Sequence, residues 1–219
     1  MDYRQALYCM NILAIECSQP SASLCLSSDR EVKFSTEWKA VRNHDSFLFP
    51  ALEKALSTLA TDKLDLVLVG AGPGSYGGVR VALAAAVGIA TVRKARVVAI
   101  GSWDSLATDG AAIISDARRG GWTIRRPDGE IAVLSTEELQ SEIEQGLLVY
   151  SIETSDLLIN RGISVVKSGL VPTAIGLVDS WLQLTPVQQA ALAGKPAEPI
   201  YVRPPHITEA KRKPWEISQ

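Results

Sequence analysis

The sequence contains few of the residues that usually build a metal centre or a disulfide framework. It has only two histidines, His44 and His206, and three cysteines, Cys9, Cys17 and Cys25. The cysteines form no C-x-x-C pair and the histidines are far apart in the chain, so we expect neither a zinc ligand set nor disulfides. Cys17 and Cys25 are predicted to be small core residues of a protein in a reducing compartment.

Long apolar runs and an excess of one charge are missing as well. No apolar run reaches the roughly 18 residues that span a membrane, and the first residues lack the basic-then-apolar order of a signal peptide. With 22 Lys and Arg against 24 Asp and Glu, the net charge is -2, which provides no basic field to hold nucleic acid. We therefore expect a cytoplasmic protein with no membrane contact.

An alternation of strand and helix patterns occurs twice along the 219 residues. Three short strand patterns are followed by a helix, a strand, the helix 77–94 and a strand, and a second set of three strand patterns begins at residue 111. Glu16 and Asp116 occupy equivalent places after the first strand of each half. The order predicts a duplicated α/β fold. We expect a tail (1–10), a first lobe (11–101), a second, reduced lobe (102–197) and a C-terminal tail (198–219).

The segment LVLVGAGPGSYGGVRVALAAAVGIA, residues 66–90, predicts a strand, a glycine-rich turn and a helix. Its glycines fit G-x-G-x-x-G, which leaves a dinucleotide site open. The acid expected at the end of the next strand is missing, however, and no Lys-Ser or Lys-Thr follows the glycines as a Walker loop requires. The alternative is a tight structural turn, built from Gly72, Pro73, Gly74, Gly77 and Gly78.

The helix after this turn carries a stripe of small side chains, which lets another helix approach closely. With the preceding helix, 47–59, it is predicted to present a surface that a pair of partner helices would complete. The surface is self-complementary under a two-fold axis, so we expect a homodimer when the chain is alone. The predicted partner-binding residues are Phe47, Leu48, Ala51, Leu52, Val81, Ala84, Ala85 and Gly88.

Glu16 and Asp116 keep a second hypothesis open, because acids in these places hold a metal–nucleotide in actin-like phosphotransferases. The chain would then be an actin-like ATPase or kinase. Glu16 lacks the glycine-rich stretch that such a phosphate loop needs. The consecutive residues His44, Asp45 and Ser46 point in different directions and cannot align as a catalytic triad; Asp45 or Ser46 is expected to cap a helix.

Five segments resemble, in order, the TsaB family, formerly called YeaZ. They are ILAIECS, VRNHDSFLFPALEKAL, LVGAGPGSYGGVRVALAAAVGIA, DARRGGWTI and EPIYVR. The resemblance runs from Asn11 to about Arg203 and is most specific in the glycine-rich block. Glu16-Cys17 replaces the usual Asp-Thr, and Tyr76-Gly77-Gly78-Val79 replaces the usual Phe-Thr-Gly-Leu.

The resemblance implies an actin-like ATPase (ASKHA) fold with duplicated ribonuclease-H-like lobes. It also implies a non-catalytic subunit that binds and activates a TsaD-like catalytic subunit. That complex places threonylcarbamoyl on the tRNA adenosine beside the anticodon, and a TsaE-like ATPase joins it. On this basis we expect no catalytic residue, metal or cofactor in the chain itself, ATP only in the complex, and tRNA contact only through the complex.

Overall fold

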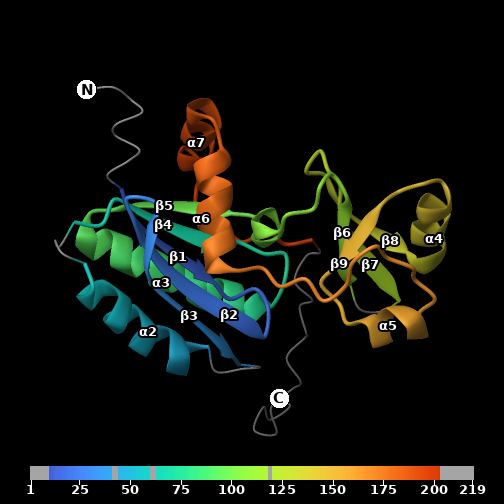
Figure 1. Cartoon of the computed structure of the whole chain (residues 1–219), viewed down its shortest axis with the longest axis horizontal. Coiled ribbons are helices and arrows are strands. Elements are labelled where there is room, and N and C mark those ends of the chain that lie inside the picture. The colour runs from blue at the N-terminus through green and yellow to red at the C-terminus, as the bar shows by residue number, and fades with distance from the viewer. Residues whose placement is uncertain (1–9, 41–43, 60–62, 118–119, 203–219) are drawn as a thin grey trace, which may run out of the picture.

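The computed structural model describes residues 10–40, 44–59, 63–117 and 120–202. They form two α/β lobes that lie side by side along the long axis of the molecule (Figure 1). Each lobe is built around one sheet. The chain passes from the first lobe to the second and then returns to the first.

The first lobe contains a five-stranded sheet in the order β3-β2-β1-β4-β5. β1 pairs antiparallel with β2 and parallel with β4, and β2 pairs antiparallel with β3, so three strands form the meander that the sequence predicted. β5 continues the sheet parallel to β4. The bounds are β1 (Asn11–Glu16), β2 (Ser21–Ser28), β3 (Glu31–Lys39), β4 (Leu66–Gly70) and β5 (Arg96–Ile100).

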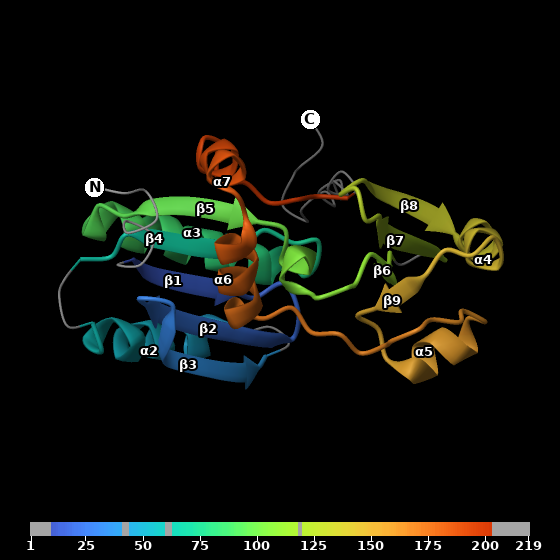
Figure 2. The same ribbon diagram turned by 45° about the horizontal axis from the view of Figure 1, so that its top comes forward.

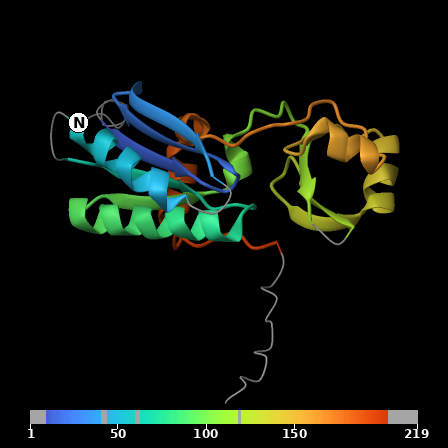
Figure 3. The ribbon, with the colours of Figure 1, turned by 90° about the horizontal axis from the view of Figure 1, so that it is seen from below.

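Helices cover both faces of this sheet, because successive strand residues point to opposite sides. On one face, α2 (Asp45–Ser57) and α3 (Tyr76–Arg93) cover the sheet, as the view from below shows (Figure 3). Their buried side chains pack on Leu13 and Ile15. On the other face, Ile12 and Ala14 form a separate core with α6 (Ala174–Gln183). The next helix, α7 (Pro186–Ala193), contributes the partly buried Leu192 and Ala193 to that core.

The second lobe repeats the strand order of the first with one strand fewer. Its sheet runs β8-β7-β6-β9, with two antiparallel pairs as in the first lobe and one parallel pair where the first lobe has two. Trp122 and Leu139 are among the side chains buried in its own core. The bounds are β6 (Ala112–Asp116), β7 (Gly121–Arg125), β8 (Ile131–Ser135), α4 (Thr136–Glu144), β9 (Val149–Ser151) and α5 (Ser155–Asn160).

A short 3-10 helix, η1 (Ser102–Ser105), links the lobes at the point where the chain first crosses (Figure 2). Asp104 of η1 forms an ion pair with Arg125 of β7. Burial raises the pKa of the Asp104 carboxyl, and the neighbouring Arg125 opposes that rise. α6 also packs closely on this link, because Gly176 lets the helix approach the carbonyl oxygen of Ser105.

The fold prediction is confirmed, whereas three details differ. The segment 102–197 is not one lobe, because α6 and α7 return to cover the first sheet. The apolar run GISVV, residues 162–166, has a sequence pattern that suits a further strand, but it forms none, and the neighbouring Lys167 makes an isolated bridge to Tyr150. α2 is preceded by His44 as its N-cap residue, without a capping side-chain bond, rather than by Asp45 or Ser46.

Candidate functional site

An apolar groove runs between α2 and α3 on the side of these helices that faces away from the sheet. Its volume is about 480 Å³. α2 supplies Phe49, which is 56% exposed, while Ala84 and Gly88 of α3 leave space for it. The lining residues are Asp45, Phe49, Leu52, Leu56, Val81, Ala84, Ala85, Gly88 and Ile89.

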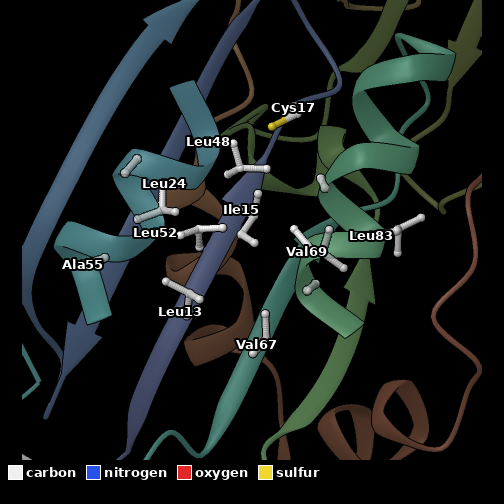
Figure 4. Close-up of a cluster of buried hydrophobic side chains, with 14 of the residues drawn as sticks. Leu13, Ile15, Cys17, Leu24, Leu48, Leu52, Ala55, Val67, Val69 and Leu83 are labelled. Atoms are coloured by element: carbon white, nitrogen blue, oxygen red, sulfur yellow. The ribbon is translucent and has the colours of Figure 1, made fainter. Parts of the chain in front are cut away.

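The structure corrects part of the predicted partner surface. Leu48 and Ala51 are buried and belong to the core between α2 and the sheet. Figure 4 shows Leu48 and Leu52 beside Ile15 in that cluster. Leu52 and Ala85 are also nearly buried, yet they form the floor of the groove. Phe47 is exposed but does not line it.

The other predicted partner-binding residues of α3 do lie at the groove. They are Val81, Ala84 and Gly88, and all three line it. Phe49 and Leu56 also line the groove but were not among the predicted partner-binding residues. Their spacing in the sequence could have identified them. Phe49, Leu52 and Leu56 recur at helical spacing, one position beyond the stripe that faces the core.

The glycine-rich turn after β4 is filled by the chain's own backbone. A β-carbon on Gly74 would lie 2.2 Å from the carbonyl oxygen of Ser18, and one on Gly78 would lie 2.0 Å from that of Cys17. The Ser75 N–H also donates to Ser18 O at 2.6 Å. Carbonyl oxygens thus occupy the start of α3, where a dinucleotide phosphate would bind. They repel an anion, so the geometry gives the dinucleotide hypothesis no support.

Only some of the glycines serve the turn. Gly72 has a φ of +92°, in the left-handed region, and Gly74 and Gly78 allow the close backbone contacts. Pro73 is buried within the turn. Gly77 lies inside α3, and a β-carbon there would meet nothing within 4 Å. The predicted structural role therefore does not apply to Gly77.

Glu16 ends β1 with a fully buried side chain, not with one that faces an open cleft. Its Oε1 accepts a 2.6 Å hydrogen bond from the backbone N–H of Ser18. The carboxyl group occupies the space beside Gly70, where Ser102 Oγ is also close. Burial raises the pKa of Glu16 above its ordinary value, and hydrogen bonds from Ser18 and Ser102 oppose this rise.

Replacing Glu16 by glutamine is expected to stabilise the protein at neutral pH. A carboxyl whose pKa is raised in the folded state stabilises the fold below its unfolded pKa, and that stability is lost as pH rises through the folded pKa. The gain from Glu16→Gln should therefore be roughly 1–3 kcal/mol near pH 7 and vanish near about pH 4.

Urea unfolding of Glu16→Gln across this pH range tests the expectation. Glu53→Gln, on the exposed face of α2, is the matched control and should change little. A loss of stability in Glu16→Gln at both pH values would mean that the bond to Ser18 needs the charged carboxylate.

Asp116, the second predicted nucleotide residue, is held inside the second lobe. Its Oδ1 accepts a 2.7 Å hydrogen bond from Arg161 Nη1, and its backbone N–H donates to Glu153 Oε1 at 2.9 Å. The Arg161 guanidinium also lies 4.7 Å from the centre of the Trp122 ring. A nucleotide held by Glu16 and Asp116 would have to expose one carboxyl and break the ion pair of the other. Arg118 and Arg119 lie outside the described residues.

The described part of the chain contains no cluster of three or more His, Cys, Asp or Glu side chains that could hold a metal ion. His44 is 5% exposed and packs near Gly78, and burial lowers its pKa. Cys17 and Cys25 are buried free thiols, as predicted. His206 and Cys9 lie outside the described residues.

The apolar character of α3 raises the separate question of a membrane. By length and composition, α3 is the one helix in the described ranges that would reach across a bilayer. Core helices of many proteins meet the same criterion. Val79, Ala82 and Ala86 of α3 are buried in the first lobe, so part of its apolar surface packs on the sheet.

Comparison with known proteins identifies relatives of part of this sequence. Residues 38–124, from the end of β3 through most of β7, match the family model described as TsaD: tRNA N6-adenosine threonylcarbamoyltransferase. No curated protein sequence matches the chain.

Two solved structures from Pseudomonas aeruginosa have the same fold. One, described as an uncharacterized protein with similarity to peptidase YEAZ, superposes with a TM-score of 0.70 at 23% identity, covering 89% of this chain and all of the other. The other, YeaZ, gives 0.67 at 23% identity and covers 88% of this chain and 99% of its own. The resemblance predicted from the sequence is thereby confirmed: the chain has the YeaZ (TsaB) fold, and its central segment matches the TsaD family model.

Proposed function

We propose that the chain is a TsaB-type, non-catalytic subunit in threonylcarbamoyl modification of the tRNA adenosine beside the anticodon. In this role it binds and activates a TsaD-type catalytic subunit. The YeaZ fold and the family match over residues 38–124 support a place in this modification. The apolar groove between α2 and α3 is the observation that carries the binding role.

The groove has the properties of a surface that another pair of helices covers. Phe49 projects with 56% of its surface exposed, and burying such a ring on association releases apolar area from water. Ala84 and Gly88 add almost no side-chain volume, so a partner helix can approach the α3 backbone closely. Among the described residues that line the groove, Asp45 alone has a charged side chain, which suits an apolar contact.

The two carboxyl groups of the actin-like hypothesis support a non-catalytic role. Glu16 is buried and Asp116 is paired with Arg161. A subunit whose two candidate nucleotide-binding carboxyl groups are buried or paired depends on its partner for the transfer reaction. The proposal includes a homodimer in the absence of the partner, a TsaE-like ATPase in the assembly and a cytoplasmic location. ATP is bound only by the complex, tRNA is bound tightly only through the complex, and the chain itself has no cofactor.

Coexpression with the TsaD-type subunit from the same genome tests the proposal. We expect the two chains to copurify and to restore threonylcarbamoyl-adenosine in a strain that lacks its own TsaB-type subunit, measured by mass spectrometry of tRNA nucleosides. The isolated chain is expected to transfer nothing and to hydrolyse no ATP. Failure to copurify, or turnover by the chain alone, would contradict the proposal.

A further inference from the structure

After α7 the chain returns to the glycine-rich turn and binds along it. The Ile200 N–H donates a 2.8 Å hydrogen bond to the carbonyl oxygen of Ala71. Backbone and side-chain atoms of Ile200 lie against Gly72 and Gly101, where there are no β-carbons to exclude them. This anchor fixes the position of the next residue, Tyr201, beside the start of α3.

Tyr201 stacks there on Tyr76, the first residue of α3. The ring centres are 5.4 Å apart and the ring planes differ by 29°. Arg80, one helical turn later, donates a 2.7 Å hydrogen bond from Nη1 to the Tyr76 hydroxyl, and its guanidinium lies 4.9 Å from the centre of that ring. We call Tyr76, Arg80 and Tyr201 the Tyr–Arg platform.

The Tyr–Arg platform remains open to solvent. Tyr76 is 51% exposed and Tyr201 is 47% exposed, and Arg80 is exposed as well. Anchoring the segment 198–202 does not require this exposure, since Ile200 already fixes it. Two half-exposed rings, with a guanidinium over one of them, place exposed aromatic surface next to a positive charge.

Unpaired nucleotides fit that chemistry. Bases of single-stranded RNA stack on tyrosine rings and on guanidinium planes, while the phosphate beside each base attracts the arginine charge. Paired bases in a duplex are already stacked and do not offer their faces. The Tyr–Arg platform therefore selects for loops and single strands.

The charge distribution along the sequence supports the same ligand. The chain as a whole has a net charge of -2, but the residues beyond the described range, 203–219, reverse the balance. Their sequence starts two positions after Tyr201 and has four basic side chains against two acidic ones. The basic residues are Arg203, Lys211, Arg212 and Lys213. Basic residues in this part of the sequence add sequence-independent attraction to phosphates.

We propose that the Tyr–Arg platform is a contact site for unpaired RNA bases. The inference rests on the proposed function in one respect, since the RNA would be the unpaired loop of the substrate tRNA. It adds a contact made by this chain itself, at the amino-terminal end of α3. The isolated chain would bind weakly, with a Kd above about 1 µM, because its net charge opposes RNA.

The test uses the full-length chain and two fluorescein-labelled RNAs of equal length, a single strand and a duplex, followed by fluorescence anisotropy at low salt. We expect the single strand to bind about fivefold more tightly or better. Tyr76→Leu and Tyr201→Leu should each weaken binding of the single strand by about tenfold and leave the duplex unchanged, since each removes one stacking surface. Leucine keeps the apolar cover over the turn.

Two matched controls isolate the effect of the platform. Arg80→Gln should weaken binding of the single strand more than Arg96→Gln, which removes an exposed charge at the other end of the α3–β5 unit. A single strand that contains 4-thiouridine should crosslink to peptides with Tyr76 or Tyr201. Melting temperatures of all variants should stay close to that of the wild type.

Equal affinity for single strand and duplex would overturn the proposal, as would Tyr76 and Tyr201 variants that bind like the wild type. Loss of copurification with the TsaD-type subunit in these variants, with RNA binding retained, would assign the platform to protein contact instead. A wild-type chain that fails to copurify with the TsaD-type subunit but still prefers single strands through the platform would overturn the proposed function alone.

Discussion

Replacing Gly78 by alanine is expected to remove about 3 kcal/mol or more of the unfolding free energy, whereas the same change at Gly77 is expected to stabilise the protein. A β-carbon on Gly78 would lie 2.0 Å from the carbonyl oxygen of Cys17. That oxygen belongs to the backbone just after β1, so it has no rotamer by which to move away. Relief requires shifting α3 or the β1 end, and both are packed in the core.

Gly77 is the matched control because it lies next to Gly78 in the same helix. A β-carbon there would meet nothing within 4 Å. Alanine loses less backbone entropy than glycine in a helix, so Gly77→Ala should gain roughly 0.5–1 kcal/mol. Urea unfolding followed by circular dichroism measures both variants.

If Gly78→Ala proves insoluble, Gly74→Ala provides a second test. Its β-carbon would lie 2.2 Å from the carbonyl oxygen of Ser18, also a backbone atom. Comparable stability of Gly77→Ala, Gly78→Ala and Gly74→Ala would show that the turn accommodates added β-carbons. The claim that backbone atoms fill the position of a dinucleotide phosphate would then fail.

The sequence predicted the two sheets well because their strands are short apolar or alternating runs separated by turn residues. It did not predict where α6 packs. The apolar periodicity of residues 174–183 marks a helix with one buried face, but it does not say which sheet that face covers. The answer depends on long-range contacts, such as the hydrogen bond from the Ala174 N–H to Ser23 Oγ. Such a pairing of distant segments leaves no local pattern.

The candidate groove shows the same limit at the scale of one helix. α2 has two apolar stripes one position apart, and only the position of the sheet decides which one is buried. Leu48 and Ala55 contact the core, whereas Phe49 and Leu56 line the groove. A sequence pattern gives the spacing of a stripe, but the partner of each stripe comes from tertiary packing.

The position of Glu16 in the sequence motif did not predict the environment of its carboxyl group. An acid at the end of the first strand is the place where actin-like enzymes hold a metal–nucleotide, so the sequence kept that hypothesis open. The structure has Gly70 on the neighbouring strand, and the missing β-carbon leaves the space that the carboxyl group fills. The direction of the side chain thus depends on a residue more than fifty positions away.

Placing a glutamate at Ala84 is expected to abolish both homodimerisation and binding of the TsaD-type subunit, by about a hundredfold or more, without unfolding the chain. Ala84 is exposed and lines the groove, so a longer side chain there fills the partner's space and leaves a charge unpaired in the contact. Glutamate is preferred to arginine because Asp45 lines the same groove and would pair with a cation.

Two variants on α3 serve as controls for Ala84→Glu. Val92→Glu places the same charge on a residue that is 80% exposed and outside the groove, and it should bind like the wild type. Ala85→Glu should unfold the lobe, because Ala85 is only 8% exposed and packs in the core. Sedimentation measures the dimer, copurification measures the heterodimer, and circular dichroism measures the fold.

The two assemblies should respond unequally to Ala84→Glu, and this inequality tests the two-fold symmetry itself. In an isologous dimer each substitution occurs twice, so two new carboxylates meet two copies of Asp45 across one small interface. In the heterodimer only one glutamate is added, against a partner surface that does not carry it. The homodimer dissociation constant should therefore rise further than that of the heterodimer, and it should recover in part at high salt. Equal losses in both assemblies would mean that the homodimer does not bring its two copies of Ala84 together under the two-fold axis. An unchanged homodimer would place its contact elsewhere on the lobe, and unchanged binding in both assemblies would exclude the α2–α3 groove as the partner surface.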